Sequence, residues 1–308
     1  MNTFDFKNIM VMGAGGVGGY FGGKLTLNSS RKISLVARGE HLKAIKKQGL
    51  VVESIDGDFV VEGPASENPV DLPRPDLILF TVKSYDTDHA IEQIKSVVSE
   101  TTQILPLQNG IENIPKLVEA FGDERVMYGL CRIGIRISEP GKLSHTNPGS
   151  VILGEKDGRR SERIEWIKNI YDEVGVECKI STNIRREIWK KFSWNSIFNM
   201  ITAAENQTTD HLYENGKPKP RLRKLANEIL KVAKAEGVNL HEEDLEKMVV
   251  KTQNIGAFIT STLNDRRVGK KMEFDAFTGA ILRLGEKHSI ELPEYQKLHK
   301  DLQKADIS

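Results

Sequence analysis

Four polar residues recur at positions i, i+4, i+8 and i+11 of a predicted helix and therefore share one row along it: Lys191, Asn195, Asn199 and Thr202. Apolar side chains crowd the rest of residues 187–202, a pattern typical of a buried helix. Burying a lysine is costly unless it is paired or functional, and a lysine in such a place can donate a proton to a reacting group. The alternative is an amphipathic helix whose polar row faces water.

The carboxylate of Glu273 is a second candidate for chemistry, near the start of another predicted helix. Acids at helix N-termini are stabilised by the helix dipole without any catalytic duty, so the position by itself favours a structural role. The histidines and the two cysteines, Cys131 and Cys178, show no ligand spacing, and we expect no metal site. The cysteines are expected to be free thiols, and a disulfide between them is the alternative.

A glycine-rich motif follows the first predicted strand and opens a helix, and its residues are Gly13, Ala14, Gly15, Gly16, Val17 and Gly18. In this context the motif predicts a dinucleotide site. Gly13 permits a tight turn, Gly15 lets the backbone approach a pyrophosphate, and Gly18 allows close helix–strand packing. The helix N-terminus then offers N–H groups to the anion. The alternative is a glycine-rich turn without a ligand.

Three further residues stand at the ends of predicted strands, where open α/β sheets bind ligands. Arg38 ends the second strand, where an NAD site would carry an acid, and its guanidinium suits a 2′-phosphate. The sequence therefore favours NADP(H) over NAD, unless Arg38 is only a solvated surface residue. Lys83 and Asn109 follow two later strands, and their shared placement favours a role in the site over a plain turn.

The elements that must position these residues alternate between strands and helices in the first half of the chain. Predicted strands cover residues 8–12, 32–37, 76–82 and 103–107, with helices from the glycine motif to about Asn28 and near 40–48. Residues 50–61 predict a hairpin around Asp56–Gly57. A β-rich run over 126–154 has turns at Pro140–Gly141 and Pro148–Gly149, and a βαβ-like end closes near Ile180.

From Asn183 onward strand signals disappear and helices are predicted at about 183–204, 219–236, 242–264, 272–287 and 293–304. Residues 213–220, rich in Gly, Pro and Lys, form the best loop candidate. The fold class is thus α/β, with an N-terminal Rossmann-type dinucleotide-binding domain followed by an all-helical C-terminal domain. We expect the first domain, 1–182, to bind NADP and the second, 183–308, to hold substrate and catalytic residues.

Composition excludes several classes of protein. The chain has 308 residues with 44 basic and 43 acidic side chains, a balance that gives no reason to expect a nucleic-acid or membrane partner. No apolar run approaches the roughly 20 residues that cross a bilayer, and the early first strand leaves no room for a signal peptide. We expect a cytoplasmic enzyme with a small-molecule substrate, and a homodimer is compatible with the sequence.

Along nearly its whole length the chain resembles the ketopantoate reductase (2-dehydropantoate 2-reductase) family. In the first half the resemblance rests on the GAGGVGG motif, on Leu35–Gly39, on Thr81–Ser84 and on Gln108–Gly110. In the second half it rests on Ile188–Phe192 with Asn195 and Asn199, and on the stretch from Ser261 through Glu273–Asp275.

The resemblance implies roles for these residues. Lys191 matches the catalytic lysine that protonates the ketone oxygen, and Glu273 matches the acid that binds and orients the substrate. Asn195 and Asn199 match substrate-contacting asparagines, while Ser261 matches the hydroxyl that meets the substrate carboxylate. Asn109 is expected between cofactor and substrate, and Arg38 and Lys83 at the NADPH site.

The implied reaction is the NADPH-dependent reduction of 2-dehydropantoate to (R)-pantoate in pantothenate and coenzyme A biosynthesis. Three departures from the family pattern, at Met272, Thr278 and Met200–Ile201, lie on the substrate side. They leave open a reductase of another branched 2-oxo acid. A third alternative is a non-catalytic NADPH-sensing module, against which the presence of both Lys191 and Glu273 argues.

Overall fold

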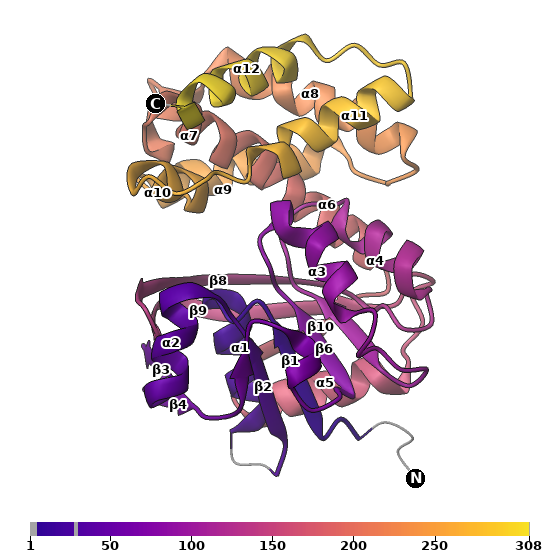
Figure 1. Ribbon diagram of the computed structural model, residues 1–308. Helices are drawn as coiled ribbons and strands as arrows, with labels where there is room; N and C mark the ends of the chain where they lie inside the picture. The colour runs from indigo at the N-terminus through magenta and orange to yellow at the C-terminus, as the bar shows by residue number, and fades with distance from the viewer. Residues whose placement is uncertain (1–4, 28–29, 308) are drawn as a thin grey trace. The chain divides into compact units, whose positions relative to one another are not determined.

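The computed structural model describes residues 5–27 and 30–307, and these form two compact units (Figure 1). The first unit comprises Met1–Asn109 and Asn113–Ile184, and the second comprises Gly110–Glu112 and Arg185–Ser308. The segment Gly110–Glu112 therefore belongs with the second unit, although the chain on either side of it belongs to the first.

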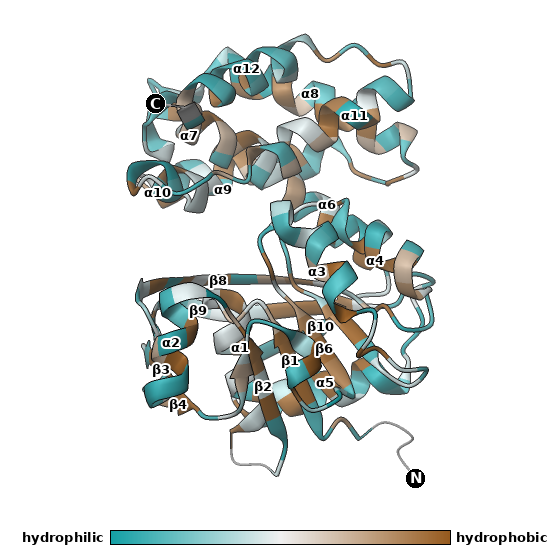
Figure 2. Ribbon diagram, in the orientation of Figure 1, coloured by the Kyte–Doolittle hydropathy of each residue, from teal (hydrophilic) through white to brown (hydrophobic). Residues whose placement is uncertain are grey.

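A five-stranded parallel sheet organises the first unit, with the strand order β5-β2-β1-β6-β7. Its strands are β1 (Asn8–Met12), β2 (Lys32–Val36), β5 (Ala65–Ser66), β6 (Leu77–Phe80) and β7 (Gln103–Pro106). Every residue of β6 and β7 is buried, and Figure 2 shows the apolar character of the sheet in brown. Because β1 lies between β2 and β6, the strand order reverses at β1, which is where such sheets bind ligands.

The helices of this unit are α1 (Gly16–Thr26), α2 (Gly39–Gln48), α3 (Thr87–Ile94), α4 (Asn113–Phe121) and α5 (Glu162–Glu173). Two short 3-10 turns, η1 (Pro69–Asp71) and η2 (Ser84–Asp86), accompany them. The first helix was predicted to reach about Asn28, which lies outside the described residues, and as described it ends at Thr26.

A second sheet, of order β10-β9-β3-β4 with β8 paired to β9, completes this unit. Its strands are β3 (Leu50–Ser54), β4 (Phe59–Val61), β8 (Tyr128–Glu139), β9 (Lys142–Gly154) and β10 (Glu177–Ile180). Helix α1 packs between the two sheets: an added Cβ at Gly22 would lie 2.4 Å from Val11 of β1, and one at Gly19 would lie 2.5 Å from Leu50 of β3. The glycines of α1 therefore serve close packing as well as the turn before it.

The predicted hairpin over residues 50–61 is confirmed, since β3 and β4 pair antiparallel. The turn at Pro140–Gly141 is also confirmed, between β8 and β9. The turn predicted at Pro148–Gly149 is wrong, because β9 runs through both residues. They lie opposite a register shift between Arg132 and Gly134, and a β-bulge of this kind accommodates a proline that cannot donate a ladder hydrogen bond.

Helices dominate the second unit, which confirms the fold class of a Rossmann-type domain followed by a helical one. They are α6 (Ile184–Trp194), α7 (Met200–Glu205), α8 (Pro220–Ala235), α9 (Glu242–Ile255), α10 (Ser261–Arg267), α11 (Thr278–Lys287) and α12 (Pro293–Ile307), with 3-10 turns η4 (Thr209–Leu212) and η5 (Phe274–Ala276). The predicted loop 213–220 contains a small hairpin of β11 (Tyr213–Glu214) and β12 (Lys217–Pro218).

Three helix predictions in this unit need correction. The run 183–204 is interrupted by a π-helical segment, η3 (Asn195–Asn199), between α6 and α7. The run 242–264 is two helices, because Gly256 adopts a φ of 72° after α9 and the chain restarts only at Ser261. The run 272–287 begins with the 3-10 turn η5, and its α-helix starts at Thr278.

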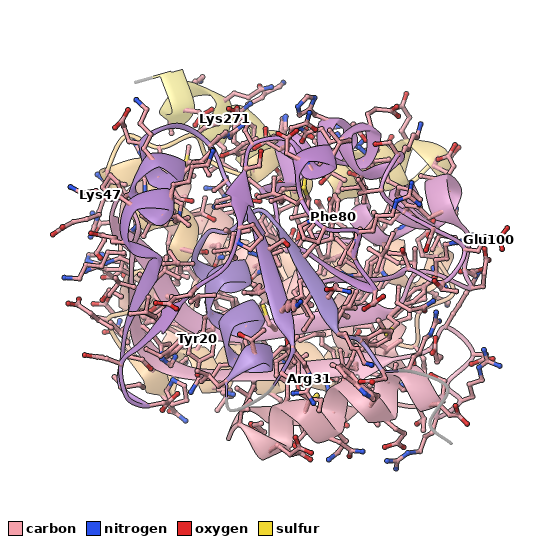
Figure 3. The ribbon with its side chains drawn as sticks, turned by 60° about the horizontal axis from the view of Figure 1, so that its bottom comes forward. Tyr20, Arg31, Lys47, Phe80, Glu100 and Lys271 are labelled. Atoms are coloured by element: carbon pink, nitrogen blue, oxygen red, sulfur yellow. The ribbon has the colours of Figure 1, made fainter. Side chains whose placement is uncertain are left out.

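Large aromatic side chains anchor the core of the first unit. Figure 3 labels two of them, Tyr20 of α1 and Phe80 at the end of β6, and both are fully buried. The hydroxyl of Tyr20 donates to Asp56 at 2.9 Å, and burial raises the pKa of this tyrosine well above its ordinary value. Throughout residues 5–27 and 30–307, no helix is long and apolar enough to cross a membrane.

Candidate active site

The glycine-rich motif forms the turn from β1 into α1. Gly13 has a φ of 96°, and an added Cβ there would lie 2.8 Å from the backbone nitrogen of Val82. An added Cβ at Gly18 would lie 2.5 Å from the carbonyl oxygen of Gly13, so this helix residue packs directly on the turn. Around Gly15, in contrast, no atom lies within 4 Å of that position. The loop therefore has open space where a pyrophosphate would approach the backbone, and no side chain caps α1 at Gly15.

Two side chains that sequence reasoning did not single out fix this turn. Thr81 follows β6 and donates its hydroxyl to the carbonyl oxygen of Gly13 at 2.8 Å. His41, in the first turn of α2, contacts the carbonyl oxygen of Ala14 through Nε2 at 2.8 Å and accepts the N–H of Gly141 at Nδ1, 3.0 Å away. With Nδ1 accepting from Gly141, Nε2 is the nitrogen placed to donate to Ala14. The only sequence signal for His41 is its place three residues after Arg38.

The basic residues predicted for the cofactor lie at neighbouring strand ends. Arg38 directly precedes α2, and its side chain is 67% exposed. It donates from Nη2 to the carboxylate of Asp86 at 2.8 Å, a contact that the sequence did not predict. Lys83 is exposed and precedes the turn η2, whose last residue is Asp86. Arg38 and Lys83 thus flank the end of β1 from β2 and β6 respectively.

Asn109 follows β7 at the same edge of the sheet, since parallel strands end together. Its carbonyl oxygen accepts from the side chain of Asn113 at 2.6 Å, and Asn113 accepts from Thr87 of α3 at 2.9 Å. The preceding Gln108 donates to the carbonyl oxygen of Val82 at 2.8 Å. This network ties the segment after β7 to the segment after β6, and Gln108 is a third residue, after Thr81 and His41, whose role sequence reasoning left unassigned.

The polar row of the second unit is buried for most of its length. Asn195 is 6% exposed, Asn199 2% and Thr202 0%, so the alternative of a row facing water is wrong; Lys191, in the last turn of α6, is half-buried. Thr202 donates within its own helix and contacts Thr260, the residue that caps α10. Its role is therefore to attach α10 to α7.

Asn195, Asn199 and Ser261 come together around the π-helical segment. The side-chain nitrogen of Asn199 lies 3.4 Å from the amide oxygen of Asn195 and 3.3 Å from the hydroxyl of Ser261, the first residue of α10. The amide oxygen of Asn199 is buried and has no hydrogen-bond partner among residues 5–27 and 30–307. Short π-helical segments concentrate at functional sites, and a buried acceptor without a donor indicates a place where a ligand's donor would be stabilising.

Glu273 is positioned by a different part of the second unit. It is half-buried and directly precedes the turn η5, not the first turn of an α-helix as predicted. Thr278 of α11 donates to the carbonyl oxygen of Phe274 and contacts Nδ1 of His299 at 2.8 Å. Burial lowers the pKa of His299. Thr278 therefore holds the turn that follows Glu273, while Met272, which precedes Glu273, is buried; both are departures noted above.

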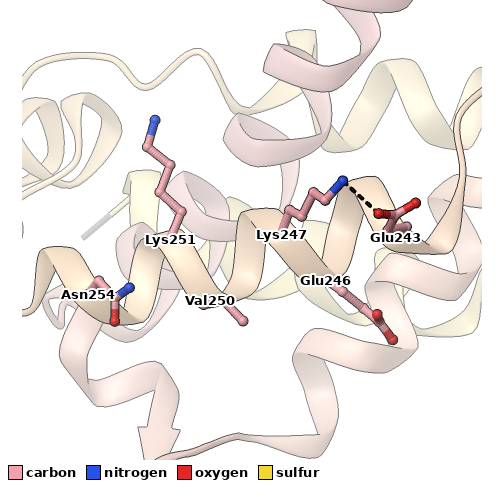
Figure 4. A pocket seen from close by; sticks show the side chains of 6 residues that line it. All are labelled: Glu243, Glu246, Lys247, Val250, Lys251 and Asn254. Carbon is pink, nitrogen blue, oxygen red and sulfur yellow. Dashed lines mark ion pairs between the residues drawn. The ribbon is translucent and has the colours of Figure 1, made fainter.

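A shallow hollow elsewhere on this unit runs along α9 and contains none of the predicted site residues. Six side chains of one helix line it: Glu243, Glu246, Lys247, Val250, Lys251 and Asn254 (Figure 4). Lys247 and Glu243 form an exposed ion pair of 2.6 Å there. Across the described parts of the chain, no three His, Cys, Asp or Glu side chains gather in a way that could hold a metal ion.

Comparison with known proteins decides the family. The family model of ketopantoate reductase PanE/ApbA matches residues 9–158, and the model of its C-terminal part matches residues 183–305. The chain is 30% identical over 285 residues to 2-dehydropantoate 2-reductase of Pyrococcus horikoshii, covering 92% of this chain and 93% of that one. The chain belongs to the ketopantoate reductase family. It is therefore an oxidoreductase of a family whose cofactor is NADP(H).

Solved structures agree with this assignment. The crystal structure of 2-dehydropantoate 2-reductase from Methylococcus capsulatus matches with a TM-score of 0.88 and 27% identity over 97% of both chains. The complex of D-mandelate dehydrogenase with NADH matches with a TM-score of 0.82 and 25% identity, covering 97% of this chain and 98% of that one. The ketopantoate reductase fold is thus also that of an enzyme named for a different 2-hydroxy acid.

Proposed function

We propose that this protein reduces 2-dehydropantoate to (R)-pantoate with NADPH, the step that supplies pantoate for pantothenate and coenzyme A biosynthesis. The observation that carries the proposal is the polar group of Asn195, Asn199 and Ser261, which begins four residues after Lys191 in a ketopantoate reductase chain. Residues 1–182 hold the cofactor in this proposal, and residues 183–308 supply the substrate and catalytic groups.

The cofactor residues are those at the carboxyl edge of the parallel sheet. Gly13, Ala14, Gly15, Gly16, Val17 and Gly18 receive the pyrophosphate on backbone N–H groups at the start of α1. The guanidinium of Arg38 binds the 2′-phosphate, and Lys83 adds positive charge nearby. Asn109 lies at the end of β7, on the side of the substrate. NADPH, when bound, supplies the hydride that the ketone carbon accepts.

The protein side chains manage the charge and the proton of this reaction. As the ketone carbon accepts hydride, negative charge develops on its oxygen, and the ammonium group of Lys191 stabilises that charge and transfers a proton to it. Glu273 accepts a hydrogen bond from the substrate's terminal hydroxyl. Ser261 donates to the substrate carboxylate, and the amide oxygen of Asn199 accepts a substrate hydroxyl.

A second candidate is the reduction of another branched 2-oxo acid. It is favoured by the match to D-mandelate dehydrogenase and by the unusual residues Met272 and Thr278 behind Glu273. A panel of 2-oxo acids assayed at equal concentration discriminates the two: the highest kcat/KM should belong to 2-dehydropantoate. A sensing module without catalysis is not retained, because membership of this family makes the chain an enzyme.

The test of the proposed mechanism is the oxidation of NADPH by 2-dehydropantoate, followed by absorbance, in wild type and Lys191→Ala. General acid catalysis contributes roughly 10²–10⁴-fold, so kcat should fall by that factor while NADPH binding stays within about twofold. The adjacent Lys190→Ala is the matched control, since Lys190 is half-buried in the same helix and pairs with Glu187 at 3.2 Å.

An unchanged kcat in Lys191→Ala would remove the proton-donor role. A wild-type enzyme that binds NADPH but does not turn over 2-dehydropantoate would contradict the substrate while leaving the cofactor site intact. Equal losses in Lys190→Ala and Lys191→Ala would indicate damage to the helix and not the loss of an acid.

A further inference from the structure

Asp86 carries its carboxylate into the predicted 2′-phosphate site. It is the last residue of η2 and occupies the N-cap position of α3, where an aspartate commonly accepts a backbone N–H of the helix. Here the side chain makes no such cap. It turns instead to Arg38, whose Nη2 lies 2.8 Å from its carboxylate, and it is 27% exposed.

The pair joins two strand ends across the end of β1. Arg38 follows β2 and Asp86 follows β6, and these strands flank β1, which leads into the glycine-rich loop. A 2′-oxygen that accepts from the same Nη2 of Arg38 would lie within about 6 Å, two hydrogen-bond lengths, of the Asp86 carboxylate. The predicted 2′ site therefore contains a cation and an anion side by side, the Arg38 guanidinium and the Asp86 carboxylate, and not a cation alone.

Each partner of the pair recognises a different dinucleotide. A guanidinium binds the dianionic 2′-phosphate of NADPH, and only one of its nitrogens faces Asp86. A carboxylate accepts the 2′-hydroxyl of NADH, the role that NAD sites usually give to an acid at the end of the second strand. The same carboxylate repels a 2′-phosphate.

We propose that Asp86 is a specificity-determining residue that gives this enzyme use of NADH beside NADPH and limits its preference for NADPH. The inference rests on the proposed function, because it takes the dinucleotide to bind at the glycine-rich loop. Asp86 accepts the ribose hydroxyl of NADH, and Arg38 carries the preference for NADPH.

The test is a direct titration of wild type, Asp86→Asn and Arg38→Ala with NADPH and with NADH, followed by the fluorescence of the bound dinucleotide without any 2-oxo acid. Wild type should bind both dinucleotides. Asp86→Asn should raise the Kd for NADH about fivefold, because a charge-assisted hydrogen bond is lost, and lower the Kd for NADPH about threefold. Arg38→Ala should raise the Kd for NADPH about 30-fold and leave that for NADH within about twofold.

The matched control is Asp88→Asn, an aspartate in the first turn of α3 that pairs with Lys116 at 2.8 Å and should change neither Kd. Equal changes of both Kd values in Asp86→Asn would reduce Asp86 to a structural residue. Weaker binding of NADPH alone would show that Asp86 only orients Arg38, and either result overturns the inference. If the wild type binds neither dinucleotide, the proposed function is overturned as well. If it binds both but does not turn over 2-dehydropantoate, only the substrate assignment is contradicted.

Discussion

Asn199 combines a buried position with an unsatisfied group. Its amide oxygen has no hydrogen-bond partner in the described part of the chain, and such a buried acceptor costs about 1–3 kcal/mol of folding free energy. The side-chain nitrogen donates to Asn195 and Ser261, so only the oxygen of this amide is unsatisfied. A folded protein keeps such a group where function requires it, and stability and activity should then respond in opposite directions.

Substitution Asn199→Leu should keep the branched shape and the number of heavy atoms of this side chain and remove the unsatisfied oxygen. We expect a Tm equal to or above that of wild type, and a kcat/KM for 2-dehydropantoate lower by about 100-fold. Thermal unfolding and steady-state kinetics of the same preparation check both. A lower Tm with unchanged kcat/KM would assign Asn199 to the core and not to the substrate site.

At the level of single residues, the sequence predicted the types of side chain better than their partners. Asn195, Asn199 and Ser261 were expected from a resemblance, and the structure adds that they contact one another. Asp86 and His41 were not expected, because each acts on a residue far away in the chain. Such contacts depend on the strand order, which no local pattern encodes.

Among the elements, α5 is attached to both sheets of the first unit through one buried arginine. Arg163 is 6% exposed and donates from Nε and Nη2 to both oxygens of Glu155, which follows β9 and is 4% exposed. Its Nη1 donates to Gln103 of β7 at 2.7 Å. The ion pair therefore joins β7, α5 and the end of β9.

Removing one partner of this ion pair leaves the other charge buried. Arg163→Met should reduce the free energy of unfolding by about 3–5 kcal/mol, measured by chemical denaturation. The double variant Arg163→Met with Glu155→Leu should recover most of that loss. Arg160→Met, whose side chain is 60% exposed, should leave the free energy of unfolding unchanged. A small loss in the single variant would mean that water reaches Glu155.

The elements whose prediction failed share a cause. The π-helical segment 195–199 keeps the same apolar spacing as an α-helix, so periodicity could not separate it from its neighbours. Pro148–Gly149 has the composition of a turn, but its position opposite a bulge is decided by the pairing with β8. Gly256 was a signal that could have predicted the end of α9, because glycine with a positive φ commonly follows the last helical turn.

For the whole molecule, pH should act on stability through carboxylates of the second unit. Burial alone would raise the pKa of Glu236, but hydrogen bonds from His288 and Lys287, at 2.6 and 2.8 Å, bring it below its ordinary value. Burial alone would likewise raise the pKa of Asp244. The hydrogen bond from the backbone N–H of His241 and the ion pair with Arg186 outweigh burial and bring this pKa below its ordinary value. Groups with a lowered folded pKa stabilise above the pKa of the unfolded chain and lose that contribution as the pH falls.

We therefore expect the Tm to fall as the pH is lowered from about 5 to about 3. Glu236→Gln should lower the Tm by roughly 2 °C at pH 7, and the difference from wild type should close toward pH 3. Thermal unfolding across this range measures it, with the exposed Glu246→Gln as control. A difference that persists at pH 3 would show that the effect is not the charge of Glu236.

The sequence predicted more about the organisation of the whole molecule than about single residues or elements. The alternation of strands and helices, the change of composition near residue 182 and the cofactor motif were all readable, because they depend on periodicity and spacing along the chain. The assignment of Gly110–Glu112 to the second unit was not, since three residues carry no compositional signal. Arg283 of α11 holds that segment through both carboxylate oxygens of Glu112, at 2.8 and 2.6 Å, and also contacts Asp275.

This detour of the chain has a practical consequence for anyone who expresses the parts separately. A single cut near Ile184 yields a C-terminal fragment that lacks Glu112 and leaves Arg283 with Asp275 alone. A faithful fragment would have to be supplied with residues 110–112 in trans or through an engineered linker. A single cut in the chain therefore does not reproduce the two compact units.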